Sequence, residues 1–174
     1  MQKSGHTTSA NSRRPVIALT MGDAAGIGPE VLVKTAMDES LRSICQLVAV
    51  GHPEVLKRAA RLTESTLRFE DVHSFDEVLG WADQQPGNFE IQTLPCIPAC
   101  ENDVAQVPFG SIDGRAGRAA YDCLVAAAKA ALAKQIDGIC TAPLNKAALK
   151  AADLDYPGHT EILGHVCEVD EFAM

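Results

Sequence analysis

Three short stretches of this 174-residue chain combine polar side chains, glycine and proline at spacings that could serve chemistry. The first is TMGDAAGIGPE at 20–30, in which three glycines let the backbone approach a ligand closely. It follows an apolar run and leads into a helical pattern opening at Pro29, and the N–H groups of a helix start attract anions. It matches neither a P-loop nor a dinucleotide fingerprint. An anion-binding turn and a tight turn without a ligand both stay open.

The second stretch is CTAPLNK at 140–146. It begins at the expected carboxyl end of a strand, which is where open α/β sheets bind ligands. Lys146 lies near a predicted helix start, where it could meet a phosphate or a carboxylate. The alternative is a solvated lysine in the first turn of a helix.

The third stretch is YPGHTE at 156–161. Pro-Gly predicts a turn, after which His159 offers an imidazole and Thr160 a hydroxyl at a helix start. Thr160 is a candidate N-cap, and a purely structural turn is the alternative for His159. A zinc site is not indicated, because His165 is six residues from His159 and HExxH is absent. We expect His165 to be structural, and no GxSxG nucleophile motif occurs.

Strand and helix patterns alternate along the chain, which predicts an α/β fold with a mainly parallel sheet flanked by helices. Residues 1–14 are polar and are expected to be a disordered leader, with the α/β part over 15–174. The prolines at 95, 98 and 108 suggest an irregular segment over 95–111. The expected strands are 16–19, 44–50, 67–69, 89–94 and 136–140, and the expected helices begin at 29, 53, 75, 115 and near 144.

Composition narrows the class of protein. The hydrophobic fraction of 47% fits a globular chain, and the net charge of −8 argues against nucleic-acid binding. An acidic chain can still bind a phosphorylated substrate through backbone N–H groups. The six cysteines include no CxxC pair, and the N-terminus has no apolar signal region. The sequence also lacks an apolar run of about 20 residues. These features predict a reduced, cytoplasmic protein that is not associated with a membrane.

Four motifs in one order, TMGDAAGIGPE at 20–30, AGRAA at 116–120, TAPLNK at 141–146 and PGHTE at 157–161, resemble the N-terminal half of the 4-hydroxythreonine-4-phosphate dehydrogenase family. The resemblance runs from Pro15 to Met174. The wording of the last two motifs is closer to the branch acting on D-threonate or D-erythronate 4-phosphate. Ala24 stands where the family usually has proline.

The resemblance implies a truncated isocitrate/isopropylmalate-dehydrogenase-like fold and NAD-dependent oxidation, with decarboxylation, of a phosphorylated four-carbon hydroxy acid such as 4-phospho-hydroxythreonine. It implies a homodimer, with 95–111 as a candidate contact. It also implies that His159 and Thr160 bind substrate, with Lys146 a weaker candidate. The ligands of the family's divalent metal (Zn, Mg or Co) and most NAD contacts are expected beyond Met174. The chain alone is therefore expected to be inactive. The alternatives are a non-catalytic phosphate or hydroxy-acid binding module and an inactive remnant.

Overall fold

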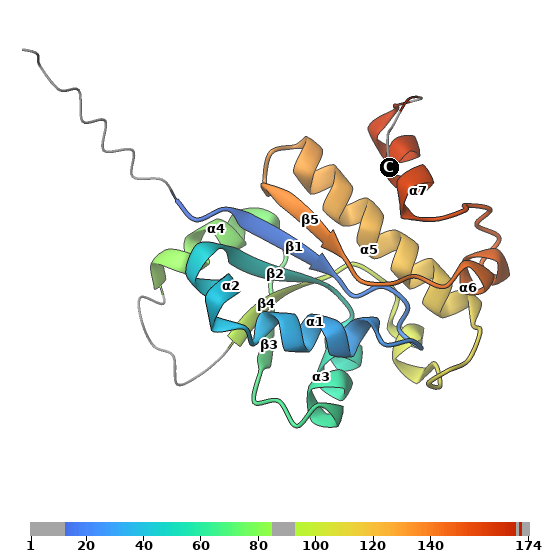
Figure 1. The fold of residues 1–174 in the computed structure, drawn as a ribbon, viewed down its shortest axis with the longest axis horizontal. Coiled ribbons are helices and arrows are strands. Elements are labelled where there is room, and N and C mark those ends of the chain that lie inside the picture. The colour runs from blue at the N-terminus through green and yellow to red at the C-terminus, as the bar shows by residue number, and fades with distance from the viewer. Residues whose placement is uncertain (1–12, 85–92, 170, 172–174) are drawn as a thin grey trace, which may run out of the picture.

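A parallel sheet forms the centre of the molecule. The computed structural model describes residues 13–84, 93–169 and 171, and within them five strands pair in the order β3-β4-β2-β1-β5, all parallel (Figure 1). This confirms the predicted α/β class. The strands are β1 (Val16–Thr20), β2 (Gln46–Gly51), β3 (Arg68–Asp71), β4 (Thr93–Pro98) and β5 (Gly138–Thr141).

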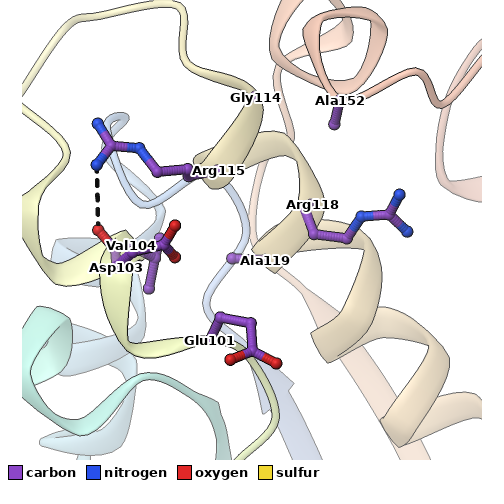
Figure 2. Close-up of a pocket in the computed structure, with 8 residues that line it drawn as sticks. All are labelled: Glu101, Asp103, Val104, Gly114, Arg115, Arg118, Ala119 and Ala152. Carbon is purple, nitrogen blue, oxygen red and sulfur yellow. Dashed lines mark hydrogen bonds between the residues drawn. The ribbon is translucent and has the colours of Figure 1, made fainter.

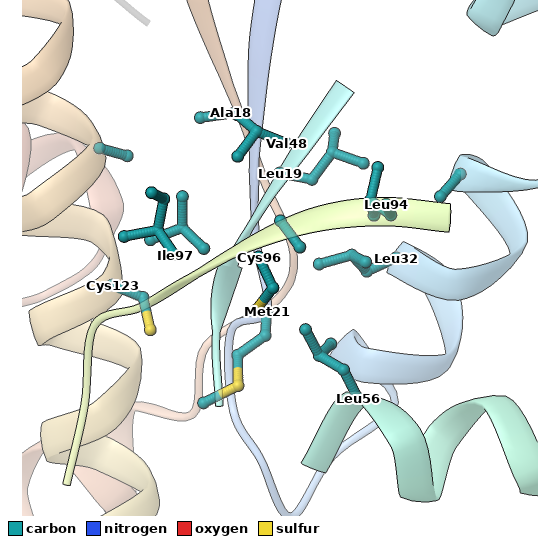
Figure 3. Packing of buried hydrophobic residues seen from close by; sticks show 14 of the residues in the cluster. Ala18, Leu19, Met21, Leu32, Val48, Leu56, Leu94, Cys96, Ile97 and Cys123 are labelled. Carbon is teal, nitrogen blue, oxygen red and sulfur yellow. The ribbon is translucent and has the colours of Figure 1, made fainter. Parts of the chain in front are cut away.

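Helices cover both faces of this sheet. Leu32 of α1 and Leu56 of α3 pack on one side of the strands, and Cys123 of α5 packs on the other (Figure 3). Helix α5 contacts β1, β2 and β5, and α6 and α7 pack against it. The helices are α1 (Gly28–Ala36), α2 (Glu39–Ile44), α3 (Pro53–Leu62), α4 (Phe75–Gln84), α5 (Gly114–Leu132), α6 (Lys146–Ala151) and α7 (His159–Cys167), with a 3-10 turn η1 (Asn102–Gln106).

The local sequence explains this layering. Strands buried on both faces need nearly continuous apolar runs, and Ala18, Val48 and Val50 are fully buried. The long helix α5 turns small side chains inward, as predicted. Gly117 on α5 lets α6 approach closely, because a Cβ there would lie 2.1 Å from the carbonyl oxygen of Ala148. A larger residue at position 117 would separate the two helices.

The chain leaves neighbouring strands β1 and β5 towards opposite faces of the sheet. The loop after β1 leads to α1 on one face, and the loop after β5 leads to α6, which packs on α5 at the other face. In open α/β sheets, ligands bind outside the carboxyl ends of two strands whose connections diverge in this way, and we call this position the crevice. The three polar stretches follow or border these strand ends.

One expected strand is shorter in the structure, and a helix that was not expected precedes it. The strand expected over 44–50 begins only at Gln46, because Ile44 is the last residue of α2 and is 64% exposed. Helix α2 was not predicted. It starts at an Asp38 cap whose carboxylate accepts hydrogen bonds from the backbone N–H groups of Ser40 and Leu41. A six-residue helix merging into an apolar strand leaves too little periodicity to separate the two.

The segment 95–111 is also more regular than expected. Strand β4 continues to Pro98 between β2 and β3, and η1 follows it. Leu94 and Cys96 are buried in this strand, and that burial outweighs the proline signal. Pro98 is the last residue of β4, where its pairing with β2 ends. The part of the expected strand at 89–92 lies outside the described residues.

The predicted leader lies mostly outside the described residues, which begin at Arg13. The Arg13 guanidinium forms an ion pair with Asp137 at 2.8 Å, and Arg14 donates to the carbonyl oxygen of Arg42. A predicted helix start is confirmed at Ser74, whose hydroxyl accepts the backbone N–H of Glu77.

Candidate functional site

The first two polar stretches meet backbone to backbone at the carboxyl ends of β1 and β5. Thr20 pairs with Thr141, and the N–H of Ala142 donates to the carbonyl of Thr20 at 3.2 Å. The N–H of Asp23 then donates to the carbonyl of Pro143 at 2.9 Å. Gly22 makes this approach possible: its φ is +66°, and a Cβ there would lie 2.3 Å from the Pro143 oxygen.

The third stretch joins them through His159, the first residue of α7. Its Nε2–H donates to the carbonyl oxygen of Ala142 at 3.2 Å, and the side chain is half-buried. In a neutral ring this bond leaves the lone pair on Nδ1. Gly28, the first residue of α1, packs closely against Ala142 as well, because a Cβ at position 28 would come within 3.2 Å of the Ala142 Cβ. The starts of α1 and α7 therefore converge on Ala142.

These two helix starts differ from their neighbours in capping. Neither α1, with Ile27 at its N-cap, nor α7, with Gly158, has an N-cap side chain that accepts from its first N–H groups. In contrast, side chains cap α2, α3, α5 and α6, supplied by Asp38, His52, Asp113 and Asn145. First-turn N–H groups that no N-cap side chain satisfies can donate hydrogen bonds to an anionic oxygen.

Acidic side chains in the first turns of α1 and α7 oppose the binding of an anion there. Glu30 lies in the first turn of α1 and Glu161 in that of α7. The Oε2 atom of Glu30 is buried and has no hydrogen-bond partner among the described residues. A ligand with both an anionic group and hydroxyl donors would satisfy this mixture better than a bare anion would.

The predicted site residues do not all come together. Thr160 is the second residue of α7, so the expectation that it caps this helix is wrong, and Gly158 holds the N-cap instead. The Pro157-Gly158 turn leads directly into the helix, which explains the shift by two residues. Lys146 starts α6 at the surface and forms no hydrogen bond or ion pair with any described residue. His165 is exposed and sets its ring edge against Tyr156, with centroids 5.9 Å apart.

Arg58 on α3 supports the first stretch and was missed by the sequence reasoning. One guanidinium nitrogen donates to the carbonyl of Ala24 at 3.0 Å, and the other donates to that of Val107 at 3.1 Å. The guanidinium also lies over the ring of Phe109, 4.2 Å from its centroid. Arg58 therefore ties the glycine-rich loop to the chain after η1. An arginine on the polar side of an amphipathic helix gives no sequence signal for this role.

Two other buried polar side chains near the crevice are structural. Asp23, 6% exposed, accepts the N–H of Ala25 at 2.9 Å and so shapes the turn. His52, 5% exposed, accepts the N–H of Glu54 on Nδ1 and donates from Nε2 to Asn102 at 3.1 Å. Both hydrogen-bonding nitrogens of His52 are thus used within the fold.

A separate pocket of about 220 Å³ lies at the start of α5 (Figure 2). Arg115 donates to Asp113 at 2.7 Å, and this bond lowers the pKa of the Asp113 carboxyl. Figure 2 shows Arg115 and Arg118 directed to opposite sides. None of the predicted site residues lines this pocket, which is formed by Glu101, Asp103, Val104, Gly114, Arg115, Arg118, Ala119 and Ala152.

The described part of the chain holds no group of three or more His, Cys, Asp or Glu side chains that could bind a metal ion. Within the same residues, no helix is long and apolar enough to span a membrane.

Comparison with known proteins agrees with these features. The D-threonate 4-phosphate dehydrogenase of Cupriavidus necator is 39% identical over 92% of this chain and 45% of its own length. A crystal structure of a 4-hydroxythreonine-4-phosphate dehydrogenase from Burkholderia phymatum superposes with a TM-score of 0.79 at 38% identity, over 92% of this chain and 46% of that one. Its counterpart from Klebsiella pneumoniae gives 0.74 at 33%, over 88% and 45%.

The chain thus spans about half the length of the relatives it matches. The model of one family, described as pyridoxal phosphate biosynthetic protein PdxA, matches residues 43–174, which is more than half of the chain. With the four motifs, the parallel sheet and the crevice in agreement, the chain belongs to the PdxA family of dehydrogenases.

Proposed function

We propose that this chain is the substrate-binding N-terminal part of a dehydrogenase that oxidises a phosphorylated four-carbon hydroxy acid, such as D-threonate 4-phosphate, D-erythronate 4-phosphate or 4-phospho-hydroxythreonine. Oxidation would be followed by decarboxylation, and the activity would belong to a chain longer than these 174 residues. The names of the relatives support the reaction class. The convergence of two uncapped helix starts on Ala142 carries the proposal for this chain.

The crevice suits the acidic groups of such a substrate. A phosphate or carboxylate oxygen can accept hydrogen bonds from first-turn N–H groups of α1 or α7, whose N-cap residues supply no side-chain cap, and the helix dipole adds to the attraction. Gly22 and Gly28 keep the backbone bare of side chains there. The substrate's hydroxyl groups can donate to the unpartnered Oε2 atom of Glu30.

Within this proposal His159 and Thr160 bind the substrate. The bond from Nε2–H of His159 to Ala142 orients the ring, so that the Nδ1 lone pair is available to a substrate hydroxyl. When the ring is protonated, Nδ1–H can instead donate to a carboxylate oxygen. Thr160, next along the helix, fixes the orientation of the same group. Lys146 is exposed at the start of α6 and adds positive charge on the approach to the crevice.

NAD and a divalent cation (Zn, Mg or Co) are the proposed cofactors. NAD accepts the hydride, and the cation polarises the substrate oxygen when bound. Because the described residues contain no three-ligand set, the metal ligands are proposed to lie elsewhere in the longer chain. This part of the protein then binds and orients the substrate. We further propose that the whole enzyme is a cytoplasmic homodimer, with residues 95–111 at the contact.

The proposal is tested first on the protein from its native cell. Its intact mass should exceed 18.5 kDa clearly, and the purified protein should reduce NAD with one of the three phosphorylated acids in a metal-dependent manner. The 174-residue chain should not. NADH formation by the 174-residue chain alone would contradict the assignment of its role, and a native mass of 18.5 kDa would favour a binding module without redox chemistry.

A variant pair then tests the site itself. His159→Gln in the full-length enzyme should lower kcat/KM on the order of 10–100-fold, because a hydrogen bond to a charged group is lost. His165→Gln on the same helix is the control, since His165 is exposed and its ring packs against Tyr156. Equal kinetics for the two variants would remove His159 from the site.

A further inference from the structure

The two outer strands of the sheet, β3 and β5, have edges of different chemistry. Among the described residues each is paired on one side only, β3 with β4 and β5 with β1 (Figure 1). The sequence of β3 is RFED, and its charged residues Arg68, Glu70 and Asp71 are all exposed. The sequence of β5 is GICT, without a charged residue. Charged side chains protect an outer strand from pairing with a further strand, so β5 is the edge that is open to one.

The register of β5 shows which of its peptide groups point away from β1. Successive residues of a strand direct their N–H and C=O groups to opposite edges. Thr141 pairs with Thr20, and the N–H of Ala142 donates to the carbonyl of Thr20 at 3.2 Å. The N–H groups of Ile139 and Thr141 therefore point to the open edge. Within residues 13–84, 93–169 and 171, β5 pairs with β1 alone, and these two N–H groups bond to no other segment.

This open edge lies beside the crevice. Strand β5 ends at Thr141, and the next residue, Ala142, accepts the hydrogen bond from His159. A strand added to β5 would therefore run next to the residues proposed to bind the substrate. The last helix, α7, packs on α5, which also contacts β5. In a longer protein, the chain that follows α7 would start near this edge.

We infer that a strand from the part of the protein outside these 174 residues pairs with β5 and continues the sheet past the crevice. This inference rests on the proposed function, in which the longer chain supplies the metal ligands. The relatives are about twice as long as this chain, so they hold ample sequence for such a strand. A strand that joins an open edge is held by main-chain hydrogen bonds, here with the N–H groups of Ile139 and Thr141 as donors.

The rest of the same chain suits this edge better than a second copy of the described residues does. A second copy would pair the four-residue β5 with itself. It would also bring no metal site to the crevice, because the described residues hold no group of three or more suitable ligands. A strand from the rest of the chain can bring the residues that follow it to the carboxyl end of β5, where the substrate is proposed to bind.

The test is hydrogen–deuterium exchange of single backbone amides in the full-length protein from the native cell. The amides of Ile139 and Thr141 should exchange on the order of 100-fold more slowly than in the 174-residue chain, because each gains an acceptor on the added strand. The amide of Ala142, already bonded to β1, should be protected in both.

The opposite edge of the sheet supplies the matched control. The N–H of Val72 donates to the carbonyl of Cys96 on β4, so the N–H groups of Phe69 and Asp71 point away from β4. Both amides should exchange fast in the full-length protein and in the 174-residue chain. Equal exchange at the two edges of the full-length protein would contradict the inference.

A pair of variants at one position tests the same contact by stability. Ile139→Pro removes an N–H that points to the open edge, whereas Ile139→Ala keeps it, and both lose the packing of Ile139 on the core. The gap between their urea midpoints should be larger in the full-length protein than in the 174-residue chain. An equal gap in the two chains would count against an added strand. The exchange of the unmodified protein decides the question even if the proline variant folds poorly.

The outcomes separate this inference from the proposed function. Fast exchange of Ile139 and Thr141 in a full-length protein that reduces NAD would overturn the inference alone. Slow exchange in a full-length protein without dehydrogenase activity would overturn the proposed function alone. Protection that falls on dilution of the protein would assign the edge to a second copy and overturn the inference. A native mass of 18.5 kDa would overturn both.

Discussion

The crevice at β1 and β5 and the pocket at the start of α5 are built from different materials. Main-chain hydrogen bonds and close approaches at Gly22 and Gly28 form the crevice, around a few polar side chains such as His159. The lining of the pocket combines four charged residues with four apolar or small ones, and its Arg115 is already paired with Asp113. One of the two arginines of the pocket is therefore already satisfied within the fold.

This difference indicates which of the two regions is better suited to bind a ligand. The N-cap residues of α1 and α7 supply no side-chain cap, whereas the start of α5 at the pocket is capped by Asp113. Three of the four motifs shared with the family lie at the crevice, and the fourth, AGRAA at 116–120, lies on α5, where Arg118 and Ala119 line the pocket. The difference in capping therefore favours the crevice as the place that binds an anion.

The largest effect is expected for Gly22→Ala, which tests whether the crevice is built from backbone contacts. The new Cβ would lie 2.3 Å from the Pro143 oxygen at a residue with positive φ, so we expect a loss of about 3 kcal/mol or more in the free energy of unfolding. Gly26→Ala in the same loop is the matched control. Its nearest neighbours are at 3.5 Å, so its loss should stay below about 1 kcal/mol. Urea unfolding measures both, and similar values would mean that the crevice is not held backbone to backbone.

Arg58→Ala tests the support behind the glycine-rich loop. It removes the hydrogen bonds to Ala24 and Val107 and the stacking on Phe109, and it leaves buried carbonyls unpaired. We expect a loss of about 2 kcal/mol. Arg61→Ala, from the exposed side of the same helix, should change stability by less than about 0.5 kcal/mol. Thermal and urea unfolding check the pair, and a neutral Arg58 variant would show that the loop stands without it.

Asp137 lies at the end of the β1–β5 pair opposite the crevice, where its carboxylate bonds to Val16 at the start of β1. The N–H of Val16, and then the Arg13 guanidinium, lower the pKa of this carboxyl. Its stabilising contribution is therefore present above its unfolded pKa of about 3.9 and disappears as the pH falls through the lower folded pKa. Asp137→Asn should cost less than about 1 kcal/mol near neutral pH, because the ion pair is largely exposed. The gap between variant and parent should close in urea titrations as the pH is lowered through the folded pKa of Asp137, which lies below its usual value.

The smallest effect is expected at the pocket. Arg118 is exposed and lies over the ring of Tyr121, 5.8 Å from its centroid, so Arg118→Ala should shift stability by less than about 0.5 kcal/mol. In the full-length enzyme it should leave kcat/KM near the parent value, in contrast to His159→Gln. A large loss of activity in Arg118→Ala would move the functional site from the crevice to the pocket.

Elements with a strong local pattern could be predicted from the sequence. The small-residue face of α5 and the buried run of β1 have unambiguous periods, and both were predicted with ends close to those observed. Helix α2 and the path of β4 could not be predicted, because each depends on partners from elsewhere. Pro95 and Cys96 are buried because β4 lies between β2 and β3, and pairing of that kind leaves no local signature.

For the site, residue types and spacing indicated three loops at strand ends, and the order of the four motifs indicated the family. Only the tertiary structure decided that two of those loops share backbone hydrogen bonds, that His159 turns to Ala142, and that Lys146 stays apart at the surface. It also decided the part played by Arg58. The reason is physical: local sequence sets the period and the turns, whereas the contact between segments more than a hundred residues apart, such as Asp23 and Pro143, follows from which strands become neighbours in the sheet.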